Sequence, residues 1–312
     1  MGKKSSQNKP LKMDAFKKLN QLPVEKRGDF SVFEIENDLQ KTDNKDFNTV
    51  KCGNIHQFDD FLKAYEKSKS SFKVISYGTT KKIIYGKSKF LFSGIKGEKK
   101  PQGLHLIGMV KRDIDALITK NPDIIPSIPK KKPNITQINL KNIEWFGTGV
   151  QALAIDVNHC YWRTAFLLGF ITKQTYFKGI ERQEYKDGRL IAIGTLGKML
   201  SVSKYENGIK VADYIDDTDY LKYGGFFWKV LEKVYELYLD LQTTLKEDFL
   251  MFLTDCVVID ESKRDVATAI MVKHGYSTKE NFITFTDIND KSVCWITDKG
   301  EEKQILHYKM IG

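Results

Sequence analysis

Cysteine, proline and histidine are all scarce in this sequence of 312 residues. The four cysteines (Cys52, Cys160, Cys256 and Cys294) lie far apart without a Cys-x-x-Cys pair, which excludes the usual spacing of a structural zinc site and predicts reduced thiols. No apolar run approaches the roughly 18 residues that a membrane span needs, and nothing resembles a signal peptide. We therefore expect a cytoplasmic protein without a membrane span.

Acidic residues are fewer than basic ones. The chain has 50 Lys and Arg against 40 Asp and Glu, a net charge of +10, and 41% of its residues are hydrophobic. The hydrophobic share predicts a globular protein with a buried core. Much of the excess charge lies in residues 1–27, where eight basic residues stand against two acids. This arm indicates binding to phosphate or to a charged surface, and a solvated, frayed chain end is the alternative.

The few prolines are concentrated in one place. Four of the seven lie in NPDIIPSIPKKKPN, together with a run of three lysines. Because proline fixes φ and lacks an N–H group, this segment is predicted to be neither helix nor central strand. We therefore predict a basic arm at 1–27, a small α+β domain at 28–121, a Pro/Lys-rich linker at 122–134 and a larger domain at 135–312.

Hydrophobic periodicity predicts mixed secondary structure on both sides of this linker. In the smaller domain we expect helices over 58–71 and 108–120 and strands over 72–78 and 88–94. The larger domain is expected to contain helices over 158–170, 171–180, 188–200, about 226–245 and 262–275, and strands over 150–155, 200–205, 281–287, 292–298 and 303–311. A turn is expected at Asn207-Gly208, and an apolar hairpin over 248–260.

Asp156 stands between a predicted strand and a predicted helix. The commonest reason for an acid at such a junction is capping of the helix N-terminus, and Asn158 could serve equally well. The stretch that starts at Asp156, DVNHCYW, also resembles motif A of the family B DNA polymerases, Asp-x-x-Ser-Leu-Tyr-Pro, with Trp162 in place of the proline.

Two later segments continue this resemblance in the order of the family. Arg189 and Gly197 keep the spacing of the first and last residues of motif B, Lys-x-x-x-Asn-Ser-x-Tyr-Gly, whose Asn, Ser and Tyr are missing here. Thr254-Asp255-Cys256 is similar to motif C, Tyr-x-Asp-Thr-Asp-Ser, with Leu253 in place of the first Asp. The resemblance covers roughly 135–312, which corresponds to the palm, and leaves no room for an exonuclease domain.

The resemblance implies an α+β fold, with a palm-like antiparallel sheet and packed helices after a small α+β N-terminal unit. It implies that Asp156 and Asp255 are catalytic and hold Mg²⁺ or Mn²⁺ in a two-metal site, with the ions about 4 Å apart. Arg189 on the facing helix is expected to neutralise triphosphate charge. The expected nucleotide-binding residues are Val157 and Asn158 through their backbone N–H groups, Tyr161 under the sugar, and Lys178 and Lys198 as further cations.

Contacts with nucleic acid, DNA in the first place, are expected from the linker lysines and from the last strand, where ILHYKMI resembles the family's Lys-x-Tyr segment. The residues concerned are Lys130, Lys131, Lys132, Tyr308 and Lys309. The resulting hypothesis is a nucleic-acid-binding protein of a virus, phage or mobile element with a degenerate palm and nucleotidyltransferase activity, working in the host cytoplasm. Other replication or virion proteins are possible partners.

Three alternatives stay open. The chain could be a catalytically silent nucleic-acid-binding or virion assembly protein, which binds phosphate through scattered lysines. A metal-dependent nuclease would need a richer carboxylate cluster. Asp217-Thr218-Asp219 copies the Asp-Thr-Asp of motif C more literally than the hairpin does, but its position before a long helix favours the polar start of that helix.

Overall fold

The computed structural model describes residues 48–51, 58–77, 80–86, 88–92, 102–289 and 292–306. The chain divides into two compact units, each built from two segments. Unit 1 comprises 1–100 and 198–219, and unit 2 comprises 101–197 and 220–312. The basic arm, Tyr308 and Lys309 lie outside the described residues, so their predicted roles have no structural counterpart here.

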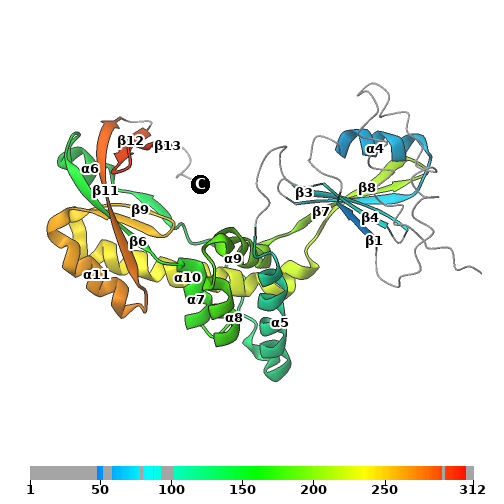
Figure 1. Ribbon diagram of the computed structural model, residues 1–312, viewed down its shortest axis with the longest axis horizontal. Helices are drawn as coiled ribbons and strands as arrows, with labels where there is room; N and C mark the ends of the chain where they lie inside the picture. The colour runs from blue at the N-terminus through cyan, green and yellow to red at the C-terminus, as the bar shows by residue number, and fades with distance from the viewer. Residues whose placement is uncertain are drawn as a thin grey trace, which may run out of the picture. The chain divides into compact units, whose positions relative to one another are not determined.

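Unit 1 contains one helix and one six-stranded sheet among its described residues. The elements are β1 (Asn48–Lys51), α4 (Phe58–Lys67), β2 (Phe72–Tyr77), β3 (Thr80–Tyr85), β4 (Ser88–Phe92), β7 (Leu200–Glu206) and β8 (Ile209–Asp216). The strand order is β1-β4-β3-β2-β7-β8, antiparallel except for the parallel pair β1 and β4. Alternation along β2 buries Phe72 and Val74 under α4, which lies on one face of the sheet (Figure 1).

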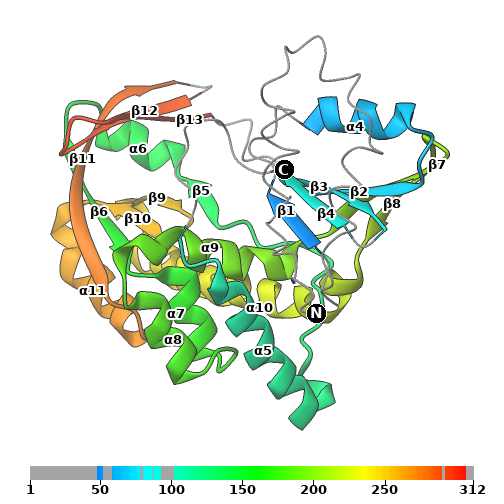
Figure 2. The same cartoon turned by 45° about the vertical axis from the view of Figure 1, so that its right-hand side comes forward.

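The sheet of unit 2 has seven strands. They are β5 (Thr136–Ile138), β6 (Gln151–Val157), β9 (Phe249–Leu253), β10 (Cys256–Ile259), β11 (Thr278–Ile288), β12 (Ser292–Thr297) and β13 (Glu302–Leu306). Their order is β13-β12-β11-β6-β10-β9-β5, and all neighbouring strands in it pair antiparallel. One face is covered by α6 (Leu140–Phe146), and the other by α10 (Thr218–Leu245) and α11 (Arg264–Lys273) (Figure 2).

Four more helices pack around the first half of α10 in unit 2. They are α5 (His105–Lys120), α7 (Cys160–Leu167), α8 (Lys173–Ile180) and α9 (Lys186–Gly194). Trp162 of α7 is buried at the centre of this cluster and donates its indole N–H to the Tyr176 carbonyl at 3.0 Å. A Cβ on Gly179 would lie 2.5 Å from the Trp162 ring, so α8 needs a glycine where it crosses that ring.

Short 3-10 turns connect several of these elements. They are η2 (Pro122–Ile124), η3 (Gln183–Tyr185), η4 (Thr195–Gly197), η5 (Lys246–Asp248) and η6 (Glu261–Lys263). No helix in the described part of the chain is long and apolar enough to span a bilayer.

The division into units differs from the predicted domain boundaries. The hairpin of β7 and β8 joins unit 1, because β7 pairs with β2 from Phe72–Tyr205 to Ser76–Ser201. The segment 122–134 lies within unit 2 and packs against α10, where a Cβ on Gly225 would lie 1.8 Å from the Pro126 carbonyl oxygen. The proline-rich segment is therefore a packed connection and not the domain linker that its composition predicted.

The predicted α+β class is confirmed, and each predicted helix and strand has a counterpart among the described residues. Most bounds agree within four residues, but α10 starts at Thr218 and not near 226, and α9 ends at Gly194 and not at 200. The predicted end of the last strand lies outside the described residues. The turn at Asn207-Gly208 and the apolar hairpin are also confirmed. The sequence reasoning missed β1, β3 and β8 in unit 1 and β5 and α6 in unit 2.

Candidate functional site

The candidate site lies where β6 ends beside the turn between β9 and β10. Leu153, Ile155 and Val157 of β6 pack toward α10 and α11, so the alternation of the strand places Asp156 on the other face. Asp156 lies opposite Cys256 of β10 on one side and opposite Lys279 of β11 on the other. The strand register therefore puts a carboxylate, a thiol and an ammonium group in one row across the sheet.

The turn between β9 and β10 holds Asp255 next to this row. Thr254 has a positive φ of 66°, and the N–H of Asp255 donates to the Leu253 carbonyl at 2.6 Å. The Asp255 carbonyl in turn accepts from the N–H of Val157 at 2.8 Å. These bonds fix the turn that carries Asp255 to the end of β6, so the structure brings Asp156 and Asp255 together.

The two carboxylates influence each other electrostatically. Burial raises the pKa of Asp255 to about 6, and the negative charge of Asp156 adds to this shift. Lys186 at the start of α9 and Lys279 act in the opposite direction. Lys279 Nζ lies 3.0 Å from Asp156 Oδ2, so part of the negative charge in the site is already balanced by the protein.

Two cysteines border the carboxylates but stay protonated. Burial, with a smaller contribution from Asp255, raises the pKa of the Cys160 thiol, and burial together with Asp156 raises that of Cys256. A thiol with a raised pKa is a poor nucleophile and a poor metal ligand. Cys160, Cys256 and Cys294 are free, as predicted, while Cys52 lies outside the described residues.

Asp156 does not cap the helix that follows it. α7 starts at Cys160, and its N-cap is His159, a left-handed residue with φ 55° and no side-chain capping bond. The N–H groups of Val157 and Asn158 donate to the carbonyls of Asp255 and Ser277, both at 2.8 Å. The prediction that these two N–H groups receive phosphate is therefore corrected, because both are already used within the sheet.

Arg189 is placed differently from the prediction. It is buried in α9, where its guanidinium donates to the Gly179 carbonyl at 2.6 Å and lies 3.1 Å from His159 Nδ1. Burial lowers the pKa of His159, and the charge of Arg189 adds to that effect, which favours a neutral ring as acceptor. Arg189 thus ties α9 to the start of α7 instead of projecting toward a triphosphate.

Tyr161 lies beside the turn that carries Asp255. Its hydroxyl is 3.4 Å from the Thr254 carbonyl, and burial raises its pKa. Lys178 forms an ion pair with Glu181 at 2.6 Å, and Lys198 belongs to unit 1. Within unit 2, the lysines that act on the pKa of Asp255 are Lys186 and Lys279.

The remaining predicted residues lie in exposed positions. Lys130, Lys131 and Lys132 are exposed, and Lys132 Nζ lies 5.2 Å from the centre of the Trp228 ring. The Asp-Thr-Asp stretch at 217–219 starts α10, whose Thr218 N–H donates to Asp216 Oδ1 at 3.1 Å. This contact agrees with its interpretation as the polar start of a helix.

The donor set suits magnesium only in part. Within the described residues, no group of three or more His, Cys, Asp and Glu side chains is arranged to hold a metal ion. Mg²⁺ commonly binds through one or two protein carboxylates and completes its shell with water and substrate phosphate. Asp156 and Asp255 fit that requirement for one ion, and burial, more than the charge of Asp156, raises the pKa of Asp255.

Sequence reasoning could not find Lys186 and Lys279 as neighbours of the carboxylates. No local spacing connects Lys279 with Asp156, because the two meet only through the pairing of β11 with β6. Comparison with known proteins gives no match to a protein-family model, to a curated protein or to a solved structure.

Proposed function

We propose that this protein acts on nucleic acid and that Asp156 and Asp255 form a degenerate palm-like centre for metal-dependent nucleotidyl transfer to DNA. The observation that carries the proposal is the meeting of these two residues, 99 positions apart by their residue numbers, through the pairing of β6 with β10. Rigid neighbouring strands are suited to hold two carboxylates for a divalent cation.

The roles of the residues follow from their positions. Asp156 and Asp255 hold the cation, which supplies Lewis acidity toward the phosphate that is attacked. Lys186 lies near enough to lower the pKa of Asp255 and is placed to attract an incoming triphosphate. Tyr161 supports the turn that carries Asp255 through its contact with Thr254. Lys279 competes with the cation for Asp156.

A second candidate is a catalytically silent nucleic-acid-binding protein with the same architecture. The ion pair between Lys279 and Asp156 favours it, because an ammonium group at 3.0 Å occupies a position that a metal ion would need. The two candidates differ in whether the carboxylates are required for turnover.

The deciding experiment is extension of a labelled primer on a DNA template with dNTPs and either Mg²⁺ or Mn²⁺. We expect extension by the wild type and a loss of about 100-fold or more in Asp156→Asn and in Asp255→Asn, since each removes a ligand of the cation that would stabilise the transition state. A matched control is Asp217→Asn/Asp219→Asn, which removes two carboxylates at the start of α10 and is expected to extend like the wild type.

Mn²⁺ binding, followed by electron paramagnetic resonance, supplies a readout that does not depend on turnover. Binding that weakens in Asp156→Asn and Asp255→Asn but not in the control supports the assigned ligands. Absence of both extension and Mn²⁺ binding in the wild type would reject the catalytic proposal in favour of the silent one. Loss of extension in the Asp217/Asp219 control alone would move the metal site to the start of α10.

A further inference from the structure

The unit 1 sheet has one face that α4 covers and one that it does not. Phe72 and Val74 of β2 pack on the covered face, so Lys73 between them lies on the opposite face and is exposed. The strand register places Lys73 opposite Lys204 of β7 and opposite Ile84 of β3. Ile84 in turn lies opposite Lys89 of β4, so three lysines occupy one row across four strands.

This row brings like charges close together. Residues that face each other on adjacent antiparallel strands are about 5 Å apart, and like charges in such a pair destabilise the sheet. Lys73 and Lys204 form such a pair, and Lys204 forms an ion pair with Glu206 at 2.5 Å. Lys82 stands on the same face one row further along the strands, opposite Ile75.

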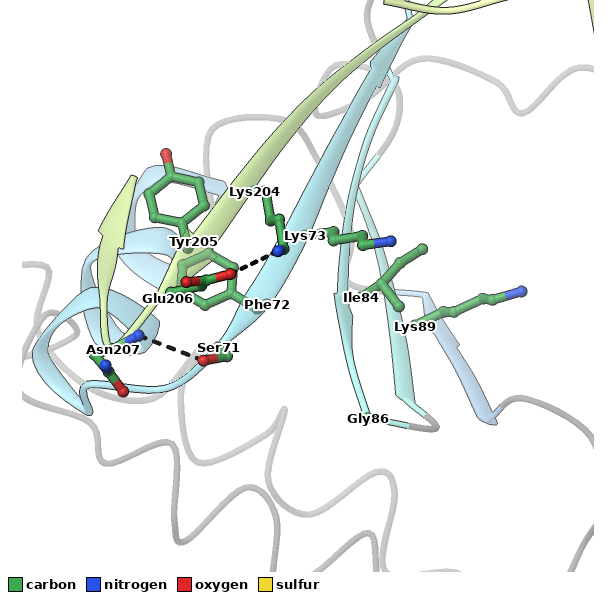
Figure 3. A pocket seen from close by; sticks show the side chains of 10 residues that line it. All are labelled: Ser71, Phe72, Lys73, Ile84, Gly86, Lys89, Lys204, Tyr205, Glu206 and Asn207. Carbon is green, nitrogen blue, oxygen red and sulfur yellow. Dashed lines mark hydrogen bonds and ion pairs between the residues drawn. The ribbon is translucent and has the colours of Figure 1, made fainter. Parts of the chain in front are cut away.

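The row borders a hollow of about 650 Å³. Its lining includes Lys73, Lys89, Lys204 and Ile84, with Glu206 as its single acid. Figure 3 shows Lys73, Ile84 and Lys89 projecting to one side of the strands, while Phe72 and Tyr205 lie on the other side. The surface is thus concave, basic and partly apolar.

An exposed aromatic ring lies on the same face of the sheet. The pairing of β7 with β8 places Ala212 opposite Lys204 and Tyr214 opposite Val202. Tyr214 is 45% exposed. Proteins that bind single-stranded nucleic acid combine a basic groove for the phosphates with aromatic rings on which bases stack.

We infer that the face of the unit 1 sheet opposite α4 binds single-stranded nucleic acid, with Lys73, Lys89 and Lys204 contacting phosphates and Tyr214 stacking on a base. Charge complementarity selects an anionic partner, since three lysines face one glutamate around the hollow. A concave surface suits a flexible strand better than a flat bilayer. This role differs from that of the linker lysines and stands whether or not Asp156 and Asp255 are catalytic.

The test is binding of the full chain to a fluorescent 20-nucleotide single-stranded DNA over a series of salt concentrations. Lys73→Gln/Lys89→Gln is expected to weaken binding by about 10-fold at moderate salt. It should also reduce the slope of log K against log salt by about 1.4, because two phosphate contacts are lost. Tyr214→Ala is expected to weaken binding by about fivefold or more with little change in that slope.

The matched control is Lys63→Gln/Lys67→Gln, which removes the same charge from exposed positions of α4 on the covered side. It is expected to bind like the wild type. Lys73→Arg/Lys89→Arg should retain affinity, which separates loss of charge from loss of folding, and thermal unfolding of each variant checks the fold directly. Equal weakening in the α4 control, or unchanged binding in Lys73→Gln/Lys89→Gln, would overturn the inference.

Two further features of the test separate nucleic-acid binding at this face from lipid binding and from the catalytic proposal. Vesicles with phosphatidylserine are titrated against the same variants. Loss of vesicle binding without loss of oligonucleotide binding would assign the face to lipid headgroups and overturn the nucleic-acid role. Oligonucleotide binding is measured in chelator without dNTPs, so failure of the catalytic proposal leaves this result unchanged.

Discussion

The two sheets of this protein differ in how their faces are covered. In unit 1 the described helix covers one face over a core of aromatic and aliphatic side chains, and the other face carries lysines. In unit 2 helices cover both faces, and all the buried polar or charged side chains of the described residues belong to this unit: Asp113, Thr164, Thr175, Arg189 and Ser292.

The difference shows which kind of chemistry each sheet permits. A carboxylate whose pKa is raised, such as Asp255, needs partial burial between fixed elements, which unit 2 supplies where β6, β10 and β11 run side by side (Figure 2). An open sheet face keeps its charges hydrated and suits contacts with an extended polyanion. The two proposals therefore concern different units: bond-making chemistry is proposed for unit 2 and strand binding for unit 1.

The largest expected effect is a loss of stability that is confined to one of the two units. Phe90 is fully buried in the unit 1 cluster, and Phe252 is fully buried in a unit 2 cluster that shares no residue with it. Phe90→Ala is expected to lower the stability of unit 1 by about 3–5 kcal/mol, the usual cost of such a cavity. Phe252→Ala should do the same to unit 2.

Hydrogen exchange followed by mass spectrometry measures both effects in one experiment. Protection is expected to fall in β2, β3 and β4 in the first variant, and in β6, β9 and β10 in the second. Equal loss of protection in both units from either substitution would show that the units unfold together and would break the comparison.

A smaller effect tests the buried charge that distinguishes unit 2. The Asp113 carboxylate of α5 accepts from the N–H and the hydroxyl of Thr172, at 2.8 and 2.9 Å, at the start of α8. Burial tends to raise its pKa, but hydrogen bonds from Thr175 and Thr172 outweigh that effect and lower it. Asp113→Ala is expected to cost about 1–3 kcal/mol, because it leaves those donors unpaired.

The sign of the pH dependence follows from the lowered pKa. Asp113 contributes its stability in full above its ordinary pKa of about 4, and this contribution is lost as the pH falls through the lower pKa of the folded state. Urea unfolding at several pH values should therefore show a difference between wild type and variant that shrinks in acid. The exposed Asp123→Ala is the control, and a pH-independent difference would contradict the assigned role.

The smallest expected effect is the contribution of Asp255, in the candidate site of unit 2, to the pH dependence of stability. Because burial and Asp156 raise the pKa of Asp255 to about 6, its charged form opposes folding at neutral pH in the absence of metal. Stability should fall as the pH rises from about 4 to 6. In chelator at pH 7.5, Asp255→Asn is expected to be more stable than the wild type by roughly 1–2 kcal/mol.

Mg²⁺ completes this test. It should raise the melting temperature of the wild type but not of Asp255→Asn, because a ligand stabilises only the state that binds it. A variant that is less stable than the wild type in chelator would contradict the electrostatic account of the site.

Much of the architecture was predictable from local patterns. Alternation in β2 and β6 and the apolar stripe from Phe226 to Leu245 reflect periods of two and about 3.6 residues, which depend only on nearby sequence. The same patterns placed Asp156 at a strand end and Asp255 at a hairpin turn. The predicted role of Arg189 was not supported, because its burial against Gly179 depends on the packing of α8 and α9.

By itself, therefore, the sequence determined the class of the fold, most helices and strands, and the positions of Asp156 near a strand end and Asp255 at a hairpin turn. Only the tertiary structure decided that the hairpin of β7 and β8 belongs to the first sheet, that Lys279 faces Asp156, and that Lys73, Lys89 and Lys204 share one row. The physical reason is that secondary structure follows from neighbours along the chain. Strand pairing depends on side chains that are distant in sequence and meet only when the sheets assemble.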